Sequence, residues 1–259
     1  MRYKHRHRVT TAVVPAAGRG TRLASLLEPG KAKEMLPLCG KPVIEHVMEE
    51  LAASGIHDVL LVLSRDKIDG FRERFGRSVL GMTVGYILQR KQNGLAGAIY
   101  RAKEYVGKVE PFAVALGDTI IDTGRDYVPL RRMIDVSASV FGMVMVEKKP
   151  REELFRYGVV KPNLETFPVF RAEAIVEKPD PANAPSDFAI AGRYVFDPSV
   201  FDYIERTAPG AGGERQITDT IGLMLQDKRD IWCLPIDRNE SMIDIGTVEA
   251  YEEAKRRFP

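Results

Sequence analysis

The chain has 259 residues, of which 44% are hydrophobic and 29% charged, a composition typical of a globular protein with a sizeable core. Its 38 Lys and Arg residues nearly balance 36 Asp and Glu, which argues against an extended basic surface for nucleic acid. No stretch reaches the roughly 18 apolar residues of a membrane span, and the two cysteines, Cys39 and Cys233, lie far apart without metal-ligand spacing. We therefore expect a cytoplasmic protein that binds neither nucleic acid nor a membrane.

The chain begins with a short basic segment, residues 1–8, in which arginine and lysine alternate with histidine. Such a segment is typical of a solvated terminal tail. The apolar run that follows is broken by Pro15 and Gly18, so it is too short for a secretory signal. We expect a basic tail over 1–8 and a single domain over 9–259.

The first half, residues 9–130, alternates short apolar runs with segments of helical period. The patterns predict strands over 10–14, 57–64, 83–88 and 112–116, and helices over 42–54, 67–75 and 94–105. Strand–helix alternation of this kind favours a doubly wound, Rossmann-like α/β fold with parallel strands. The second half, residues 131–259, is richer in strands, predicted over 139–147, 158–161, 174–176 and 188–196. A mixed sheet is expected overall.

The turn after the first predicted strand combines small residues with fixed positive charge. Ligands of open α/β sheets bind at the carboxyl ends of the strands, and bare backbone N–H groups there can approach phosphate oxygens closely. The small residues are Ala16, Ala17, Gly18 and Gly20, and Arg22 adds a planar cation. A dinucleotide fingerprint would need a third glycine where Leu23 stands, and the GxxxxGK[ST] pattern is absent. By itself the turn predicts either a phosphate site or an ordinary tight turn.

Further motifs follow in order along the chain. Gly20-Thr21-Arg22 is followed by Lys-Glu-Met-Leu-Pro at 33–37 and by Lys-Pro at 41–42. This arrangement resembles the sugar-1-phosphate nucleotidylyltransferases. Similar family segments are found at 89–98, 116–118, 156–160, 177–179, 191–194, 213–219 and 244–247. The resemblance implies a nucleotide-diphospho-sugar transferase fold with a nucleotide-binding first half and a sugar-binding second half.

The resemblance also implies an enzyme that transfers a nucleotidyl group from a nucleoside triphosphate to a sugar-1-phosphate and releases pyrophosphate. The implied catalytic residues are Arg22, Lys33 and Asp118, and the implied ligands of a Mg²⁺ cofactor are Asp118 and Asp244. The implied nucleotide-binding residues are Ala16, Ala17, Gly18, Gly20, Thr21, Gln89 and Gly94. Those implied for the sugar phosphate are Tyr157, Gly158, Glu177, Lys178 and Gly192. Homodimers or homotetramers are common in the family.

The substrate pair stays open between several alternatives. The Lys-Glu-Met-Leu-Pro form is most similar to bacterial members that use UTP and glucose-1-phosphate, whereas Asp-Ile-Gly-Thr at 244–247 is closer to members that use dTTP. The segment between Arg22 and Lys33 also departs from the usual family form, which leaves a role for Lys31 open. Another nucleotide and sugar-phosphate pair, or a non-catalytic nucleotide-sugar sensor, are further alternatives. The sensor alternative predicts damage at the implied catalytic residues, all of which are present.

Overall fold

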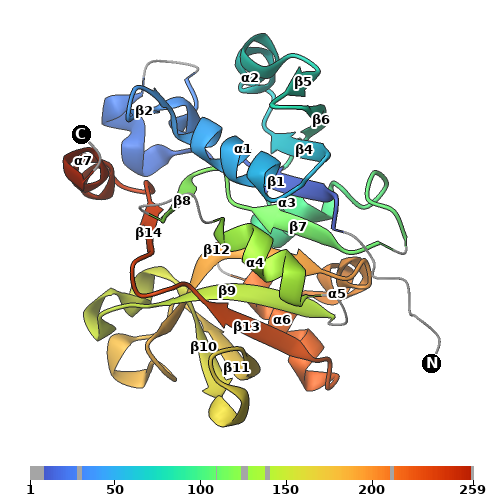
Figure 1. The fold of residues 1–259 in the computed structure, drawn as a ribbon, viewed down its shortest axis with the longest axis vertical. Coiled ribbons are helices and arrows are strands. Elements are labelled where there is room, and N and C mark those ends of the chain that lie inside the picture. Colours follow the sequence, from blue (N-terminus) through green and yellow to red (C-terminus); the bar gives the residue numbers. More distant parts are fainter. Residues whose placement is uncertain are drawn as a thin grey trace.

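The computed structural model describes residues 9–27, 31–108, 110–123, 128–137, 141–210 and 213–257. Within these ranges a ten-stranded sheet has the order β10-β11-β13-β9-β12-β7-β1-β4-β6-β5 (Figure 1). The strands are β1 (Thr11–Pro15), β4 (Asp58–Leu63), β5 (Ser78–Val79), β6 (Met82–Leu88), β7 (Phe112–Ala115), β9 (Gly142–Lys148), β10 (Gly158–Asn163), β11 (Phe170–Glu177), β12 (Phe188–Phe196) and β13 (Ile231–Pro235). The predicted basic tail over 1–8 and the first residues of the strand predicted from 139 lie outside the described residues.

The four strands predicted in the first half are parallel, whereas the short β5 runs antiparallel to β6. Strand β1 pairs in parallel with β4 and β7, and β4 pairs in parallel with β6. Successive residues of β1 are buried on opposite faces of the sheet, with Ala12 and Val14 in one apolar cluster and Val13 in another. Helices α1 (Val43–Ala53), α2 (Ile68–Phe75) and α4 (Pro129–Val136) contribute to the first cluster. Helices α3 (Leu95–Tyr100), α5 (Val200–Arg206) and α6 (Ile217–Gln226) contribute to the second, so the sheet is covered on both faces.

The second half continues the same sheet with mixed strand directions. Strand β12 runs antiparallel to β7 and β9, while β13 runs parallel to β9. Strand β11 is longer than the predicted 174–176, and α3 is shorter than the predicted 94–105. After Tyr100 the N–H groups of Ala102 and Lys103 donate to carbonyls three residues earlier, so the helix tightens into turns. The mixed α/β fold predicted from the sequence is confirmed.

A small second sheet brings distant parts of the chain together. Strand β8 (Thr119–Asp122) pairs antiparallel with β14 (Ser241–Asp244), with Asp244 opposite Thr119. The C-terminal helix α7 (Val248–Arg257) then packs near β2 (Pro37–Leu38) and the short helix η1 (Thr21–Leu26) (Figure 1). The hydroxyl of Tyr251 donates to the carbonyl oxygen of Pro37 at 2.5 Å. The C-terminal helix therefore lies beside η1, which directly follows the glycine-rich turn.

Among the described residues, no helix is long and apolar enough to cross a membrane.

Candidate active site

Two adjoining cavities lie at the carboxyl ends of the central strands. The larger cavity, about 540 Å³, is lined from the first half by the turn after β1 and by Lys33, Gln89 and Gly94. The smaller cavity, about 210 Å³, is lined mainly by second-half residues. Both cavities share Arg22, Leu95, Leu116, Asp118, Lys178 and Gln216. Asp118 and Arg22 therefore lie where two bound molecules would meet.

The turn after β1 forms one wall of the larger cavity. Residues 17–22 all line it, whereas Ala16 is buried behind the wall and its N–H donates to the Val62 carbonyl at 2.9 Å. Gly20 has a φ of 64°, a left-handed conformation that a residue with a Cβ rarely adopts. A Cβ at this position would also lie 3.3 Å from the Leu27 side chain. The glycine therefore allows the turn to lead directly into η1, which carries Arg22.

Asp118 and Asp244 are brought together by the small second sheet. Asp118 follows β7, Asp244 ends β14, and the N–H of Ile245 donates to the Asp118 carbonyl at 3.2 Å. Both side chains line the smaller cavity. Burial raises the pKa of Asp244, and the neighbouring charge of Asp118 raises it further. Two carboxylates that repel each other in this way favour a cation between them.

Lys33 lies against Asp118. Its ammonium group forms an ion pair with the Asp118 carboxylate, and only 13% of its side chain is exposed. Burial alone would lower the pKa of Lys33, but the negative charges of Asp118 and Glu34 outweigh it and raise the pKa. Burial likewise opposes ionisation of Asp118, yet Lys33 holds the pKa of that carboxyl below its usual value. Lys33 therefore stays a cation at the wall of the larger cavity.

The five residues predicted for the sugar phosphate all line the smaller cavity: Tyr157, Gly158, Glu177, Lys178 and Gly192. Glu177 accepts a hydrogen bond from the Thr218 hydroxyl and lies 3.1 Å from the Lys178 ammonium. Lys178 has a φ of 45°, a strained conformation for a non-glycine residue, and 55% of its side chain is exposed. Burial raises the pKa of Tyr157 to about 12, so its hydroxyl stays protonated.

Gln89 and Gly94 both line the larger cavity, but Gly94 has an additional structural reason to be glycine. The Gln89 side chain is 4% exposed, and its Nε2 donates to Asn93 Oδ1 at 3.0 Å. Gly94 has a φ of 92°, and an added Cβ would lie 2.4 Å from the carbonyl oxygen of Arg215. The chain at Arg215 therefore crosses directly over Gly94, a contact that the sequence pattern does not reveal.

Several cavity residues were not singled out from the sequence. Arg156 and Thr218 line the smaller cavity, and Gln92 lines the larger one. Arg156 begins the 156–160 motif, so its place in that motif was a usable signal. Gln92 lies within the 89–98 segment, but nothing in that segment singled it out. It is placed by contacts across the fold, because its Nε2 donates to the Ala17 carbonyl at 2.7 Å.

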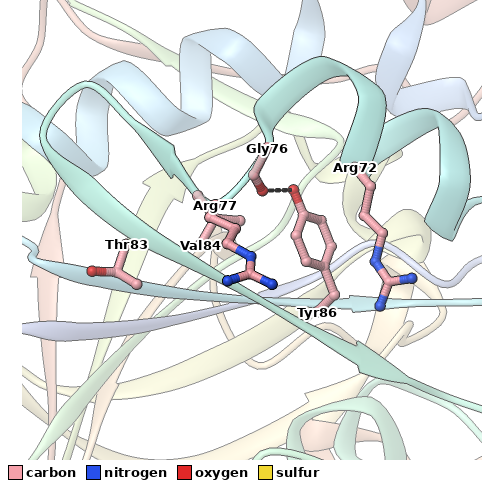
Figure 2. A pocket seen from close by; sticks show the side chains of 6 residues that line it. All are labelled: Arg72, Gly76, Arg77, Thr83, Val84 and Tyr86. Atoms are coloured by element: carbon pink, nitrogen blue, oxygen red, sulfur yellow. Dashed lines mark hydrogen bonds between the residues drawn. The ribbon is translucent and has the colours of Figure 1, made fainter.

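A separate hollow of about 640 Å³ lies beside β6 (Figure 2). Figure 2 shows Tyr86 between Arg72 and Gly76, and the Tyr86 hydroxyl donates to the Gly76 carbonyl at 2.6 Å. None of the predicted site residues lines this hollow, and its six lining residues include no carboxylate. All predicted site residues except the buried Ala16 line one of the two adjoining cavities, and none lines this hollow.

The profile of the family described as nucleotidyl transferase matches residues 11–258. The chain belongs to the nucleotidyl transferase family. A UTP–glucose-1-phosphate uridylyltransferase of Streptococcus pneumoniae is 38% identical over 246 residues, covering 86% of this chain and 82% of that protein. A protein of the same name from Staphylococcus epidermidis is 33% identical, with 92% and 88% covered.

Solved structures agree with this family membership. A UDP-glucose pyrophosphorylase complexed with UDP-glucose superposes with a TM-score of 0.88 at 28% sequence identity, covering 96% of this chain and 98% of that one. The resemblance to nucleotidylyltransferases predicted from the motifs is therefore confirmed. As a nucleotidyl transferase, the chain is an enzyme that moves a nucleotidyl group.

Proposed function

We propose that this nucleotidyl transferase moves the uridylyl group of UTP onto glucose-1-phosphate, giving UDP-glucose and pyrophosphate. The observation that carries the proposal is that Asp118 and Arg22 lie at the junction of two cavities. A reaction between two bound phosphates needs such a junction, because the reacting atoms must meet there. The curated relatives with this named activity support the choice of UTP and glucose-1-phosphate.

In the larger cavity, the triphosphate would lie on the turn after β1. The backbone of Gly18 and Gly20 allows close approach of phosphate oxygens, and Thr21 adds a hydroxyl. Gln89 would bind the base. One N–H of its Nε2 donates to Asn93, and its Oε1 could accept the N3–H of uracil or thymine. Gly94 would lie under the base.

In the smaller cavity, the sugar would lie between Tyr157-Gly158 and Gly192, where the backbone is accessible. Glu177 would accept hydrogen bonds from sugar hydroxyls, because a carboxylate offers two acceptor oxygens. The Lys178 ammonium would bind the sugar phosphate. Lys178 lines both cavities, which suits a group that holds the attacking phosphate towards the triphosphate.

The reaction itself needs no protein nucleophile. An oxygen of the sugar phosphate attacks the α-phosphorus of UTP, a new P–O bond forms, and the bond from the α-phosphorus to the bridging oxygen breaks. The electron pair of that bond leaves with pyrophosphate. Both reactants are anions, so the work of the enzyme is charge neutralisation and alignment. Arg22 and Lys33 would hold the phosphates that become pyrophosphate.

The residues present fit a Mg²⁺ cofactor at Asp118 and Asp244. Mg²⁺ in nucleotide sites is held by one or two carboxylates, with phosphate oxygens and water as the other ligands. Consistent with this, the described residues contain no cluster of three or more metal-binding side chains. When bound, Mg²⁺ would neutralise phosphate charge next to the reacting atoms. The mutual repulsion of the two carboxylates would be relieved at the same time.

A matrix of nucleoside triphosphates against sugar-1-phosphates tests the proposal, with pyrophosphate release as the readout. We expect the highest kcat/KM for UTP with glucose-1-phosphate. Uracil and thymine differ by one methyl group, worth about 1–3 kcal/mol in a pocket, so dTTP is the most informative competitor. Higher kcat/KM for dTTP would replace the uridylyl assignment with the thymidylyl one. Binding of UDP-glucose without any turnover would favour the sensor alternative.

A further inference from the structure

We infer that Lys67, which lines neither cavity, is a positioning residue that presents the turn after β1 to the triphosphate. The Lys67 side chain is 4% exposed, and Lys67 lines a different hollow, whereas its ion-pair partner Glu34 lines the larger cavity. Its ammonium group donates to the carbonyl oxygens of Ala16 at 2.8 Å and Gly18 at 2.7 Å. The inference rests on the proposed function, because it assigns a triphosphate to this turn.

The hydrogen-bonding capacity of Lys67 is fully used. A lysine ammonium has three N–H donors, and here they meet two backbone carbonyls and the carboxylate of Glu34, 2.8 Å away. Glu34 is 1% exposed, so the pair is buried. A buried ion pair is retained only with good geometry and with its remaining hydrogen bonds satisfied, because taking both charges from water is costly. Burying an ammonium to bind two turn carbonyls therefore indicates a specific role for that orientation.

The orientation of these carbonyls fixes where the neighbouring N–H groups point. In a planar trans peptide the C=O and N–H bonds are antiparallel. With the Ala16 and Gly18 carbonyls directed at Lys67, the N–H groups of Ala17 and Arg19 point the opposite way. Both residues line the larger cavity, and within the described residues no protein group accepts a hydrogen bond from either N–H. Two backbone donors are thus held towards the position proposed for the phosphates.

The carbonyl of Ala17, which lies between Ala16 and Gly18 in the sequence, is bound by a different side chain. Gln92 donates to the Ala17 carbonyl at 2.7 Å, and the Gln92 side chain itself accepts from Arg19 Nε at 2.6 Å. Three consecutive carbonyls of the turn are therefore bound by side chains from elsewhere in the chain. Carbonyl oxygens would repel a phosphate, so binding them to side-chain donors while the N–H groups of Ala17 and Arg19 stay available favours anion binding.

The test compares Lys67→Met with the wild-type chain in steady-state kinetics. Methionine keeps most of the side-chain volume but donates no hydrogen bond. Hydrogen bonds to a charged group are stronger than those between neutral groups, so we expect the KM for UTP to rise at least about tenfold. The KM for glucose-1-phosphate should change less than about twofold by the same reasoning, because no Lys67 contact reaches the smaller cavity. An equal rise of both KM values, or no rise for UTP, would overturn the inference.

A double variant separates positioning from folding stability. Lys67→Met leaves the Glu34 carboxylate buried without a partner, which lowers the Tm. Adding Glu34→Gln removes that charge, so the Tm should recover while the KM for UTP stays high, because the carbonyls still lack their donor. Return of both Tm and KM to wild-type values would show a purely structural role. Lys161→Met is the matched control, since the exposed Lys161 pairs with Glu173 away from both cavities, and it should leave the KM for UTP unchanged.

Direct titration with UTP distinguishes failure of this inference from failure of the proposed function. If the wild-type chain turned over no substrate pair, the proposed function would fail. The UTP affinity of the wild-type chain could still be compared with that of Lys67→Met, and the difference would report the effect of Lys67 on the turn. A tenfold or greater loss of affinity in Lys67→Met would support the inference. Equal UTP affinities, or no UTP binding by the wild-type chain, would overturn it.

Discussion

Arg22 reaches both cavities from an exposed position on η1, and its Nη2 would lie 3.3 Å from a Cβ added at Gly246. We expect Arg22→Ala to lower kcat by about a hundredfold, the usual cost of removing one donor to charge that develops in the transition state. Because the side chain is exposed, the Tm should stay within a degree or so of wild type. A pyrophosphate-release assay measures kcat, and a thermal melt measures the Tm.

Arg206→Ala is the matched control for this arginine. Arg206 is 54% exposed and pairs with Asp227 at 2.8 Å, and it lines neither cavity. Its kcat should equal that of the wild-type enzyme. If Arg22→Ala behaved like Arg206→Ala, Arg22 would have no part in catalysis.

The two cysteines differ sharply in environment. Cys233 is buried in β13 and burial raises the pKa of its thiol, whereas Cys39 is exposed. Because the thiolate is the reactive form, iodoacetamide should modify Cys39 in the native enzyme and leave Cys233 unmodified. Mass spectrometry of tryptic peptides measures this, with urea-unfolded enzyme as the control in which both thiols react. Alkylation of Cys233 at the same rate as Cys39 under native conditions would contradict the burial of β13.

At the residue scale, the sequence predicted side chains that stand in motifs. Arg22, Lys33 and Asp118 occur in recognisable segments, and the structure brings them to one cavity wall. Lys67 could not be predicted in this way. It lies at the start of an amphipathic helix, where a lysine is ordinarily solvated, and its burial depends on Glu34 and on turn carbonyls far away in sequence. Interactions of this kind are determined by the fold and leave no local pattern.

At the element scale, the crossing of the chain over Gly94 positions the start of α3. The N–H of Arg215 donates to the Asn93 carbonyl at 2.8 Å, and the N–H of Ala96 donates to the Arg215 carbonyl at 3.1 Å. We expect Gly94→Ala to lower the free energy of unfolding by more than about 1 kcal/mol, through the positive φ and the backbone clash. It should also raise the KM for UTP, because Gln216 next to Arg215 lines the cavity.

Gly70→Ala is the matched control for this glycine. Gly70 lies within α2, with no heavy atom within 4 Å of an added Cβ. Alanine should therefore stabilise the helix by up to about 1 kcal/mol. Urea denaturation measures the free energy of unfolding of both variants, which should fall in Gly94→Ala and rise in Gly70→Ala. An unchanged stability of Gly94→Ala would contradict the close crossing.

Among the elements that the sequence predicted best are α1, with its periodic apolar face, and β4, with its nearly continuous apolar run. The small sheet of β8 and β14 was not predicted as a pair. Each strand has four residues, and their partners lie more than a hundred positions apart, so neither local period nor turn chemistry could indicate the pairing. The family resemblance implied Asp118 and Asp244 as ligands, and it is this unpredicted pairing that brings the two residues together.

At the scale of the whole molecule, Arg193 joins the two halves of the chain. Its side chain is fully buried in β12, and its guanidinium donates to the Glu50 carboxylate of α1 at 2.7 Å and to the Thr119 carbonyl at 2.9 Å. We expect Arg193→Met to lower the free energy of unfolding by about 3–5 kcal/mol, because the mostly buried Glu50 loses its ion-pair partner and the Thr119 carbonyl its donor. Urea denaturation at pH 7 measures the change.

Arg171→Met serves as the control for Arg193→Met, since Arg171 is exposed and lies 3.5 Å from Asp230. Its effect should stay below about 1 kcal/mol, as for most surface pairs. Similar stabilities of the two variants would contradict the role of Arg193 as a buried link. The homodimer or homotetramer implied by the family resemblance stays a prediction.

The central proposal is that Asp118 and Asp244, from distant parts of the chain, would together hold one divalent ion. Mn²⁺ can replace Mg²⁺ at carboxylate and phosphate oxygens and has a measurable anomalous signal. Crystals grown with Mn²⁺ and UTP should show one anomalous peak in contact with both carboxylates and with a phosphate of the nucleotide. A peak bound to only one of the two aspartates, or no peak near either while UTP is bound, would contradict the account.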